Sequence, residues 1–252
     1  MFNAVVLAGS SKPELLAEMQ GVSNKAFILL KDKPLLSYVL RALQDVPTLD
    51  KITVVGPTAD LKLLRGSECL TFEIIGQQES LLANLAAAFK TMDPEKLCLV
   101  VTADIPLLTA DTVEKFLSLC DPDEADFYYP ILSRETCIEK YPENIRTYVR
   151  LKEGQVTGGN AVLIKPGWYL QNQDRLELFI SYRKKPLQLF RIFPLVLIMK
   201  YLLRILSVRD LENYLSHLLG FNAKAVLCDC IELGIDVDKI SDLELVRKIM
   251  QD

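Results

Sequence analysis

Residues 1–130 alternate short apolar runs with segments of helical periodicity. Strands that are buried on both faces lose the polar alternation of a half-exposed strand, and helices between them supply the crossovers of a parallel sheet. The runs that predict buried strands are Ala4–Leu7, Ile52–Gly56, Phe72–Ile75, Leu97–Val101 and Phe127–Ile131. The helical segments between them are Leu35–Leu43, Leu61–Leu64, Leu81–Lys90 and Thr112–Cys120. This order predicts an α/β fold with a doubly wound, mostly parallel sheet.

In the second half of the chain, strands and helices no longer alternate regularly. Two short apolar segments flank Glu153-Gly154, which predicts a hairpin turn. Strands are predicted at Ala161–Lys165 and Ala225–Cys228, with a helix-rich insertion at residues 174–218 between them. Ser241 and Glu244 have the spacing of a capping box that opens a last helix ending at Met250. We found no linker and no internal repeat, so we expect a single domain over residues 1–252.

Composition excludes several classes of function. A net charge of −4 argues against general nucleic-acid binding, which normally needs a basic balance. The six cysteines include no C-x-x-C pair, and the one histidine, His217, has no ligand partner nearby in sequence. The first residues, Met1–Leu7, form an apolar strand pattern without the basic start of a signal peptide. The sequence therefore predicts a cytoplasmic protein without zinc, disulfides or histidine-based catalysis.

The segment after the first strand, residues 7–27, is too long to be a plain connection. Gly9 and Ser10 can bring backbone N–H groups close to phosphate oxygens, and Lys12 and Lys25 can neutralise phosphate charge. The spacing matches neither a P-loop nor a dinucleotide fingerprint. From these residues alone, a phosphate site and an ordinary surface loop both remain open.

Aspartates follow two later strands. Asp104 comes just after an apolar strand, where a carboxylate suits either a hard cation or an Asx turn. Asp236 and Asp238 are two residues apart, so their side chains point to the same side of an extended segment. They suit a metal site or a solvated loop, whereas Asp242 is simplest as a helix-capping residue.

Taken together and in order, these stretches resemble the sugar-phosphate nucleotidyltransferase superfamily, in particular its MobA-like NTP transferase branch. The resemblance covers residues 1–130 well, and 155–166 and 230–250 moderately. It lies in Leu7-Ala8-Gly9, Lys25, Lys33-Pro34-Leu35, Asp104-Ile105-Pro106, Asp236, Asp238 and Asp242-Leu243. This chain departs from the family pattern at Ser10, where the family has a second glycine, at Asn24, where it has proline, and in lacking the loop arginine.

The resemblance implies a GT-A-like fold and Mg²⁺-dependent transfer of NMP from an NTP to a small phosphorylated acceptor, with release of pyrophosphate. It implies that Lys25 and Asp104 are catalytic and that Asp104, Asp236 and Asp238 hold Mg²⁺. The residues it implies for nucleotide binding are Leu7, Ala8, Gly9, Ser10, Lys12, Lys25, Ser80, Asn84 and Asp104. For the acceptor, the expected residues are Arg146, Thr157, Gly158, Gly159 and Asn160, although a glycine turn explains 157–160 equally well.

The insertion is outside the resemblance and is basic within an acidic chain. Residues 175–210 carry eight basic and two acidic side chains, and they include the apolar segment 187–206. Charges and Pro194 interrupt this segment, which makes it a poor membrane span. A core or homodimer helix, an interfacial helix on the inner face of the membrane, and a cover over an anionic substrate are all compatible with it.

Two other functions compete with nucleotidyl transfer. A nucleotide-binding protein with weak or no catalysis is compatible with Ser10 and the missing arginine. A glycosyltransferase of related architecture would use a nucleotide-sugar, but D-x-D is usual at its fourth strand, where this chain has Asp104-Ile105-Pro106.

Overall fold

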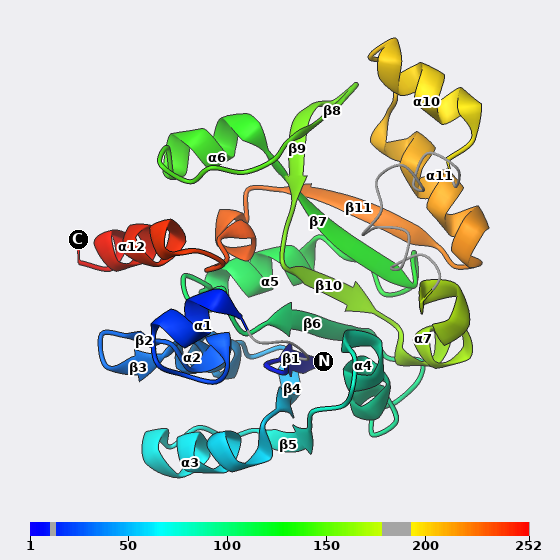
Figure 1. Ribbon diagram of the computed structural model, residues 1–252. Coiled ribbons are helices and arrows are strands. Elements are labelled where there is room, and N and C mark those ends of the chain that lie inside the picture. The colour runs from blue at the N-terminus through cyan, green and yellow to red at the C-terminus, as the bar shows by residue number, and fades with distance from the viewer. Residues whose placement is uncertain (11–13, 178–192, 252) are drawn as a thin grey trace.

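The computed structural model describes residues 1–10, 14–177 and 193–251, and a nine-stranded sheet is its central feature (Figure 1). The strand order is β5-β4-β1-β6-β10-β7-β9-β8, with β11 pairing separately with β7. The strands are β1 Phe2–Leu7, β4 Leu49–Gly56, β5 Glu73–Gly76, β6 Cys98–Thr102, β7 Phe127–Ser133, β8 Val149–Leu151, β9 Gly154–Gly158, β10 Ala161–Ile164 and β11 Ala223–Cys228. A separate two-stranded hairpin consists of β2 Leu29–Leu30 and β3 Lys33–Pro34.

The direction of the strands decides where functional loops gather. Strands β5, β4, β1 and β6 are parallel, and β10 is antiparallel to both β6 and β7. Strand β7 therefore runs the same way as β6, and β11 is parallel to β7. The carboxyl ends of β1, β6, β7 and β11 consequently meet at one edge of the sheet. The predicted fold class, a doubly wound, mostly parallel α/β sheet, is confirmed.

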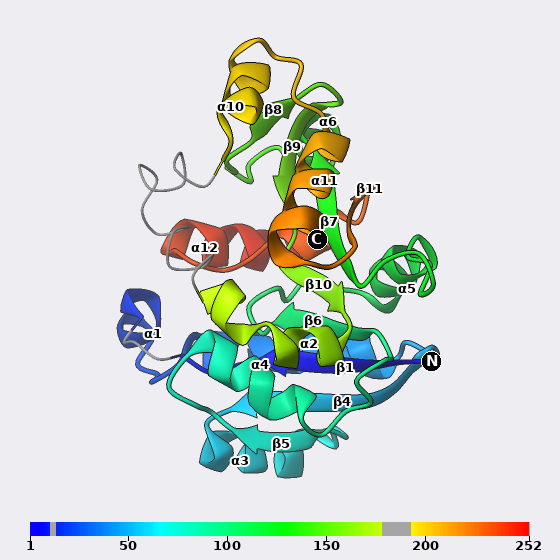
Figure 2. The same cartoon turned by 90° about the vertical axis from the view of Figure 1, so that its right-hand side faces the viewer.

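Helices cover both faces of the sheet. Residues of α2 (Leu35–Gln44), α3 (Thr58–Glu68) and α5 (Ala110–Ser118) share one apolar core with alternate residues of β1, β4 and β6. The other residues of these strands pack in a second core with α4 (Leu81–Phe89) and α7 (Pro166–Gln171), which lie on the side facing the viewer in Figure 2. Because both faces are covered, each apolar strand runs without polar alternation.

The hairpin of the second half has a turn one residue earlier than predicted. Lys152 and Glu153 form the turn, while Gly154 already belongs to β9 and pairs with Leu151. The predicted hairpin is confirmed, but its turn is Lys152-Glu153, and Gly154 supplies a positive φ of +130° at the start of the returning strand.

The capping box predicted for the last helix was wrong. Helix α12 spans Ile240–Ile249 and begins after Lys239, so Ser241 lies inside its first turn. Oδ2 of Asp242 accepts the backbone N–H groups of Asp238 (3.1 Å) and Lys239 (2.9 Å). The helix start is capped by Asp242, as predicted for that residue, and Asp242 also holds Asp238 in place.

The insertion contains α10 (Leu195–Leu202) and α11 (Val208–Leu219), which lie next to the β8–β9 hairpin in Figure 1. Of the apolar segment 187–206, residues 187–192 lie outside the described residues. In the part that the structure describes, no helix has the length and apolar character needed to span a membrane. Other short helices are α1 Leu15–Met19, η1 Lys25–Phe27, α6 Arg134–Lys140 and η2 Ile231–Gly234, and residues 173–177 are helical as well.

Candidate active site

Three aspartates converge at the edge where the parallel strands end. Asp104 follows β6, and Asp236 and Asp238 follow η2, which comes directly after β11. The backbone N–H of Val237, between the two late aspartates, donates to the carbonyl oxygen of Asp104 at 2.9 Å. One carboxylate oxygen of each aspartate lies within 4.8 Å of those of the other two. The chain therefore concentrates three negative charges at one point of the sheet edge.

Lys25 reaches this cluster from the loop after β1. Its Nζ lies 2.6 Å from Oδ2 of Asp104 and also binds Oδ1 of Asp238. The buried side chain of Asn24 holds the lysine turn: its Nδ2 donates to the carbonyl oxygen of Ala8 at 2.7 Å, and its Oδ1 accepts the N–H of Ala26 at 2.8 Å. Sequence reasoning did not assign a role to Asn24, although its side chain is a typical helix cap just before a short helix.

The electrostatics of the cluster keep the lysine charged. Burial by itself lowers the pKa of Lys25, but the carboxylates of Asp104 and Asp238 outweigh it and raise that pKa well above its ordinary value. For Asp238, burial raises the pKa, yet the hydrogen bond from Lys25 gives a net lowering. Burial, followed by the charges of Asp104 and Asp238, raises the pKa of Asp236. One lysine thus neutralises only part of the negative charge.

The donor set fits a hard divalent cation. Mg²⁺ is bound in proteins through carboxylate oxygens, and this cluster offers them from three residues. Oδ1 of Asp104 is buried and has no hydrogen-bond partner among the described residues. Buried polar atoms in folded proteins are normally paired, so an unpaired carboxylate oxygen suits the position of a metal ligand. The arrangement suits Asp104, Asp236 and Asp238 as metal ligands.

Arg146 connects the cluster with the predicted acceptor segment. Its Nη1 lies 3.5 Å from Oδ1 of Asp236, and its Nη2 donates to the carbonyl oxygen of Gly158 at 2.8 Å. Its Nε donates to Oγ1 of Thr157 at 3.5 Å. A cavity of about 280 Å³ is lined by Arg146, Thr157, Asp236 and Asp238 among others. We call it the polar cavity; a cation and hydroxyl beside the acidic cluster can hold a phosphate there.

Gly159 and Asn160 connect the 157–160 segment to β7 and η2 by backbone hydrogen bonds. The N–H of Gly159 donates to Pro130 at 3.0 Å, and that of Asn160 donates to Leu233 in η2 at 2.6 Å. The Nδ2 of Asn160 is another buried atom without a partner in the described part of the chain. The segment 157–160 therefore joins β9 to η2 and leaves an amide group available to a ligand.

The predicted nucleotide residues lie around the end of β1. A Cβ atom on Gly9 would come within 2.9 Å of Nδ2 of Asn84, so a larger residue there would displace the Asn84 side chain. Asn84 is 4% exposed, and its Oδ1 accepts the N–H of Gln78 at 2.6 Å. The Oγ of Ser80 accepts the N–H of Ala83 at 3.1 Å and caps α4. Asn84 thus braces the loop after β1 against the loop after β5.

The other predicted residues of this loop have different places. The N–H of Ala8 donates to Val55 at 2.8 Å, and the carbonyl oxygen of Leu7 accepts the N–H of Ala103 at 3.2 Å. Both therefore tie the end of β1 to its neighbouring strands. Ser10 follows in the loop, and Lys12 lies outside the described residues.

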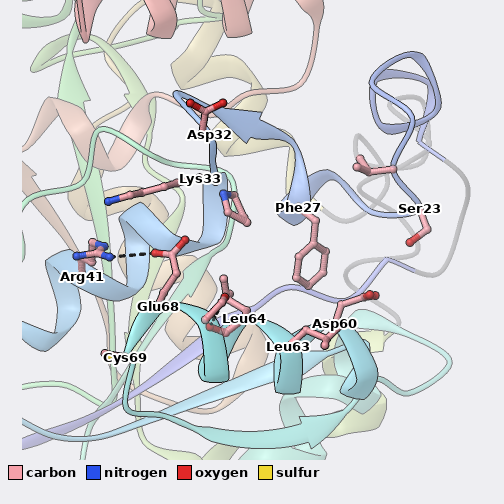
Figure 3. A pocket seen from close by; sticks show the side chains of 13 residues that line it. Ser23, Phe27, Asp32, Lys33, Arg41, Asp60, Leu63, Leu64, Glu68 and Cys69 are labelled. Atoms are coloured by element: carbon pink, nitrogen blue, oxygen red, sulfur yellow. Dashed lines mark hydrogen bonds and ion pairs between the residues drawn. The ribbon is translucent and has the colours of Figure 1, made fainter.

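A larger cavity, of about 900 Å³, lies on the α2 and α3 side of the molecule (Figure 3). Phe27 and Leu64 line it, and Arg41 forms an ion pair with Glu68 at 3.0 Å in its wall. None of the clustered aspartates lines this cavity, and neither does Lys25. The candidate active site is therefore a different place from this larger hollow.

Comparison with known proteins agrees with this geometry. The family profile of the MobA-like NTP transferase domain matches residues 4–210. A search of curated proteins found no significant match. A structure described as a hypothetical transferase from Thermus thermophilus is 32% identical, with a TM-score of 0.85 over 96% of this chain and 99% of that one.

More distant solved structures share the fold. CMP:2-keto-3-deoxy-manno-octonic acid synthetase complexed with CTP has a TM-score of 0.64 at 13% identity, over 100% of this chain and 99% of that one. The 4-diphosphocytidyl-2C-methyl-D-erythritol synthase of Anaerococcus prevotii has a TM-score of 0.60 at 12% identity, over 100% of this chain and 99% of that one. The family profile, the fold and the cluster of carboxylates at the sheet edge agree with one another. The chain therefore belongs to the MobA-like NTP transferase family and is a nucleotidyltransferase.

Proposed function

We propose that the protein transfers NMP from an NTP to a phosphate oxygen of a small phosphorylated acceptor, with Mg²⁺, and releases pyrophosphate. The observation that carries the proposal is the convergence of the Asp104, Asp236 and Asp238 carboxylates with the Lys25 ammonium group at one sheet edge. In open α/β sheets, ligands bind at the carboxyl ends of the strands.

The reaction needs positioning and charge neutralisation more than covalent catalysis. The acceptor oxygen attacks the α-phosphorus, and the bond between the α-phosphorus and the oxygen of the leaving pyrophosphate breaks. Lys25 then contacts the negative charge that develops on the transferred phosphate. Mg²⁺ held by Asp104, Asp236 and Asp238 would supply further neutralisation as a Lewis acid.

The two substrates are assigned to opposite sides of this cluster. The backbone of Leu7–Ser10, with Lys12, Ser80 and Asn84, is the side for the nucleotide. Arg146 and the 157–160 segment are the side for the acceptor phosphate. Support for this division comes from Arg146, which links Asp236 to Thr157 and Gly158.

The test is a pyrophosphate-release assay with CTP, GTP, UTP and ATP against a panel of sugar and alcohol phosphates, with Mg²⁺ or EDTA. We expect one pairing to release pyrophosphate only with Mg²⁺, and Asp104→Asn to lower kcat/KM by about 10²–10³-fold. Asp126→Asn is the matched control, since Asp126 is also a part-buried, lysine-paired aspartate, but it lies just before β7, at the opposite edge of the sheet.

Two outcomes would count against this reaction. If no pairing releases pyrophosphate while nucleotides still raise the melting temperature in the presence of Mg²⁺, the protein binds nucleotides without transferring them. The presence of Ser10 in place of the second glycine is the observation that favours that second candidate. If neither release nor metal-dependent nucleotide binding is seen, both functions are excluded.

A further inference from the structure

A second, apolar cavity lies beside the polar one. It has a volume of about 310 Å³ and is enclosed by β7, β8, β9, β11 and α11. We call it the apolar cavity. Small-molecule sites in proteins start at about this size and are lined mostly by apolar side chains. Its wall includes Ile131, Val149, Val156, Leu211, Leu215 and Ala225.

Helix α11 forms one wall of this cavity and is held to β11 by hydrogen bonds from the N–H of Ala223 to Oγ of Ser216 (2.9 Å) and from the N–H of Ala225 to Oε1 of Glu212 (2.7 Å). Leu211 and Leu215 face the cavity yet stay partly exposed, and Leu219 is the one buried residue of the helix. Interiors are normally close-packed, with few voids larger than a water molecule. An amphipathic helix held over an open apolar space therefore indicates room for a ligand rather than a finished core.

The apolar cavity adjoins the candidate acceptor site. Thr147 and Thr157 line both the polar and the apolar cavity. Gly158, whose carbonyl oxygen binds Arg146, also lines the apolar cavity. A Cβ atom on Gly158 would lie 1.9 Å from the hydroxyl oxygen of Tyr129, so glycine allows the Tyr129 ring to lie against β9 at the junction. The two cavities thus meet at one strand, with a cation and hydroxyls on one side and apolar side chains on the other.

We infer that the acceptor is a phosphorylated amphiphile, with its phosphate in the polar cavity beside Arg146 and a single apolar chain in the apolar cavity. The inference rests on the proposed function, because it names the class of acceptor for that same site. Glu212 and Lys224 also line the apolar cavity, but most of its surface is apolar. Most hydroxyl groups of a sugar would therefore be buried there without partners, which costs free energy, whereas a hydrocarbon chain gains free energy there.

Binding of n-alkyl phosphates from ethyl to decyl, measured by isothermal titration calorimetry below their critical micelle concentrations, tests the inference. We expect the affinity to rise about fourfold for each added methylene until the apolar cavity is full. Leu211→Trp fills the apolar cavity from α11, and Ala225→Leu fills it from β11. In both variants the affinity should no longer depend on the length of the alkyl chain. The affinity for ethyl phosphate should stay unchanged, which would also show that each variant is folded.

Asn213→Trp is the matched control, because Asn213 is exposed on the same helix and does not line the apolar cavity. It should keep the chain-length dependence of the wild-type protein. An affinity that is the same from ethyl to decyl phosphate would overturn the inference. A dependence that survives both Leu211→Trp and Ala225→Leu would overturn it as well.

Pyrophosphate release with the same alkyl phosphates separates this inference from the proposed function. If short sugar phosphates react and longer alkyl chains bring no rise in kcat/KM, the reaction stands and the amphiphilic acceptor is excluded. If alkyl phosphates bind with the expected chain-length dependence and no acceptor releases pyrophosphate, transfer is excluded and the amphiphile site stands.

Discussion

At the scale of single residues, one lysine organises the candidate active site. Lys25 pairs with Asp104 and Asp238, which are brought from two distant segments. Asn24 stands where the resembled family has proline. Its side chain fixes the turn that carries Lys25 through hydrogen bonds to Ala8 and Ala26. A side-chain amide thus supplies the rigidity that a proline ring would otherwise give.

Replacing the lysine by methionine separates charge from packing. For Lys25→Met, we expect kcat/KM to fall about 10²–10³-fold, because the charge on the transferred phosphate loses a fixed cation. The melting temperature without divalent ions should fall by several degrees, since the carboxylates then lose their partner. Calorimetry with and without Mg²⁺ checks this; Mg²⁺ should restore part of the loss. An unchanged melting temperature would show that the ion pairs contribute nothing to stability.

The ionised side chain of Asp236 is expected to lower the stability of the folded protein. Its folded-state pKa is raised by burial and by Asp104 and Asp238, so its ionised form is less favourable in the folded than in the unfolded chain. Asp236→Asn should therefore raise the melting temperature at pH 7 by about 2–4 °C, as expected for a gain of about 1 kcal/mol. The difference should vanish at a pH below the unfolded-state pKa of about 3.9, where the carboxyl is protonated in both states.

The same variant should bind Mg²⁺ more weakly, since it removes one of three carboxylates. Calorimetric titration of Mg²⁺ into wild-type and Asp236→Asn protein measures this loss. A variant that is less stable at pH 7 would contradict the expected sign.

At the scale of elements, η2 sets the position of the late aspartates. Glu232, which is 6% exposed, anchors η2 to two helices. Its Oε2 accepts from Oγ1 of Thr112 in α5 at 3.1 Å, and its Oε1 accepts from the hydroxyl of Tyr141 just after α6 at 3.2 Å. Lys140 pairs with the same carboxylate. Burial and this carboxylate raise the pKa of Tyr141 to about 12, so the phenol remains a donor at neutral pH.

Removing the contacts of Glu232 should loosen the proposed metal ligands Asp236 and Asp238 without changing either residue. Glu232→Ala removes the acceptor that the hydroxyls of Thr112 and Tyr141 share, and we expect a loss of about 2–3 kcal/mol in the free energy of unfolding. Mg²⁺ affinity should fall as well, while Glu232→Gln keeps the acceptor oxygen and should retain more of both. Denaturant unfolding and Mg²⁺ titration of the two variants are the measurements. Equal Mg²⁺ affinity in wild-type and Glu232→Ala protein would contradict a positioning role.

At the scale of the whole molecule, the three strands β7, β10 and β11 are joined at the edge of the sheet opposite the site. Asp126 precedes β7; its carboxylate pairs with Lys165 after β10 at 2.9 Å and accepts the N–H of Asn222 before β11 at 3.1 Å. Burial raises the pKa of Asp126, but these hydrogen bonds outweigh it and give a net lowering. A carboxylate with a lowered folded-state pKa stabilises the protein above its unfolded-state pKa.

Acid should therefore remove the contribution of Asp126. We expect Asp126→Asn to be about 1–2 kcal/mol less stable than wild type at pH 7. The loss is modest because an ion pair at a partly exposed position contributes less to stability than a fully buried one. The gap should shrink as the pH falls below about 4, because the carboxyl of the unfolded wild-type chain takes up a proton there before the folded one does. Urea unfolding at pH 7 and pH 3 measures the two gaps. A gap of the same size at both values would rule out this linkage.

The local pattern of apolar and polar residues in the sequence determined much of the fold of this protein. Buried strands and their crossover helices were predictable over residues 1–130, since apolar periodicity reports burial directly and both faces of the sheet are covered. The approach of Asp104 to the sheet edge followed from the direction of parallel strands. Helix starts were only partly predictable: Asp242 caps α12 as expected, but Ser241 does not, because capping depends on how the chain enters the helix.

Tertiary structure alone decided which residues meet. Lys25 and Asp238 are 213 positions apart, and no local periodicity encodes that contact. The same is true of the antiparallel insertion of β10 between β6 and β7, and of the apolar cavity beneath α11. Strand direction and helix periodicity depend on neighbouring residues, whereas ion pairs and cavities depend on the closure of the whole chain around its core.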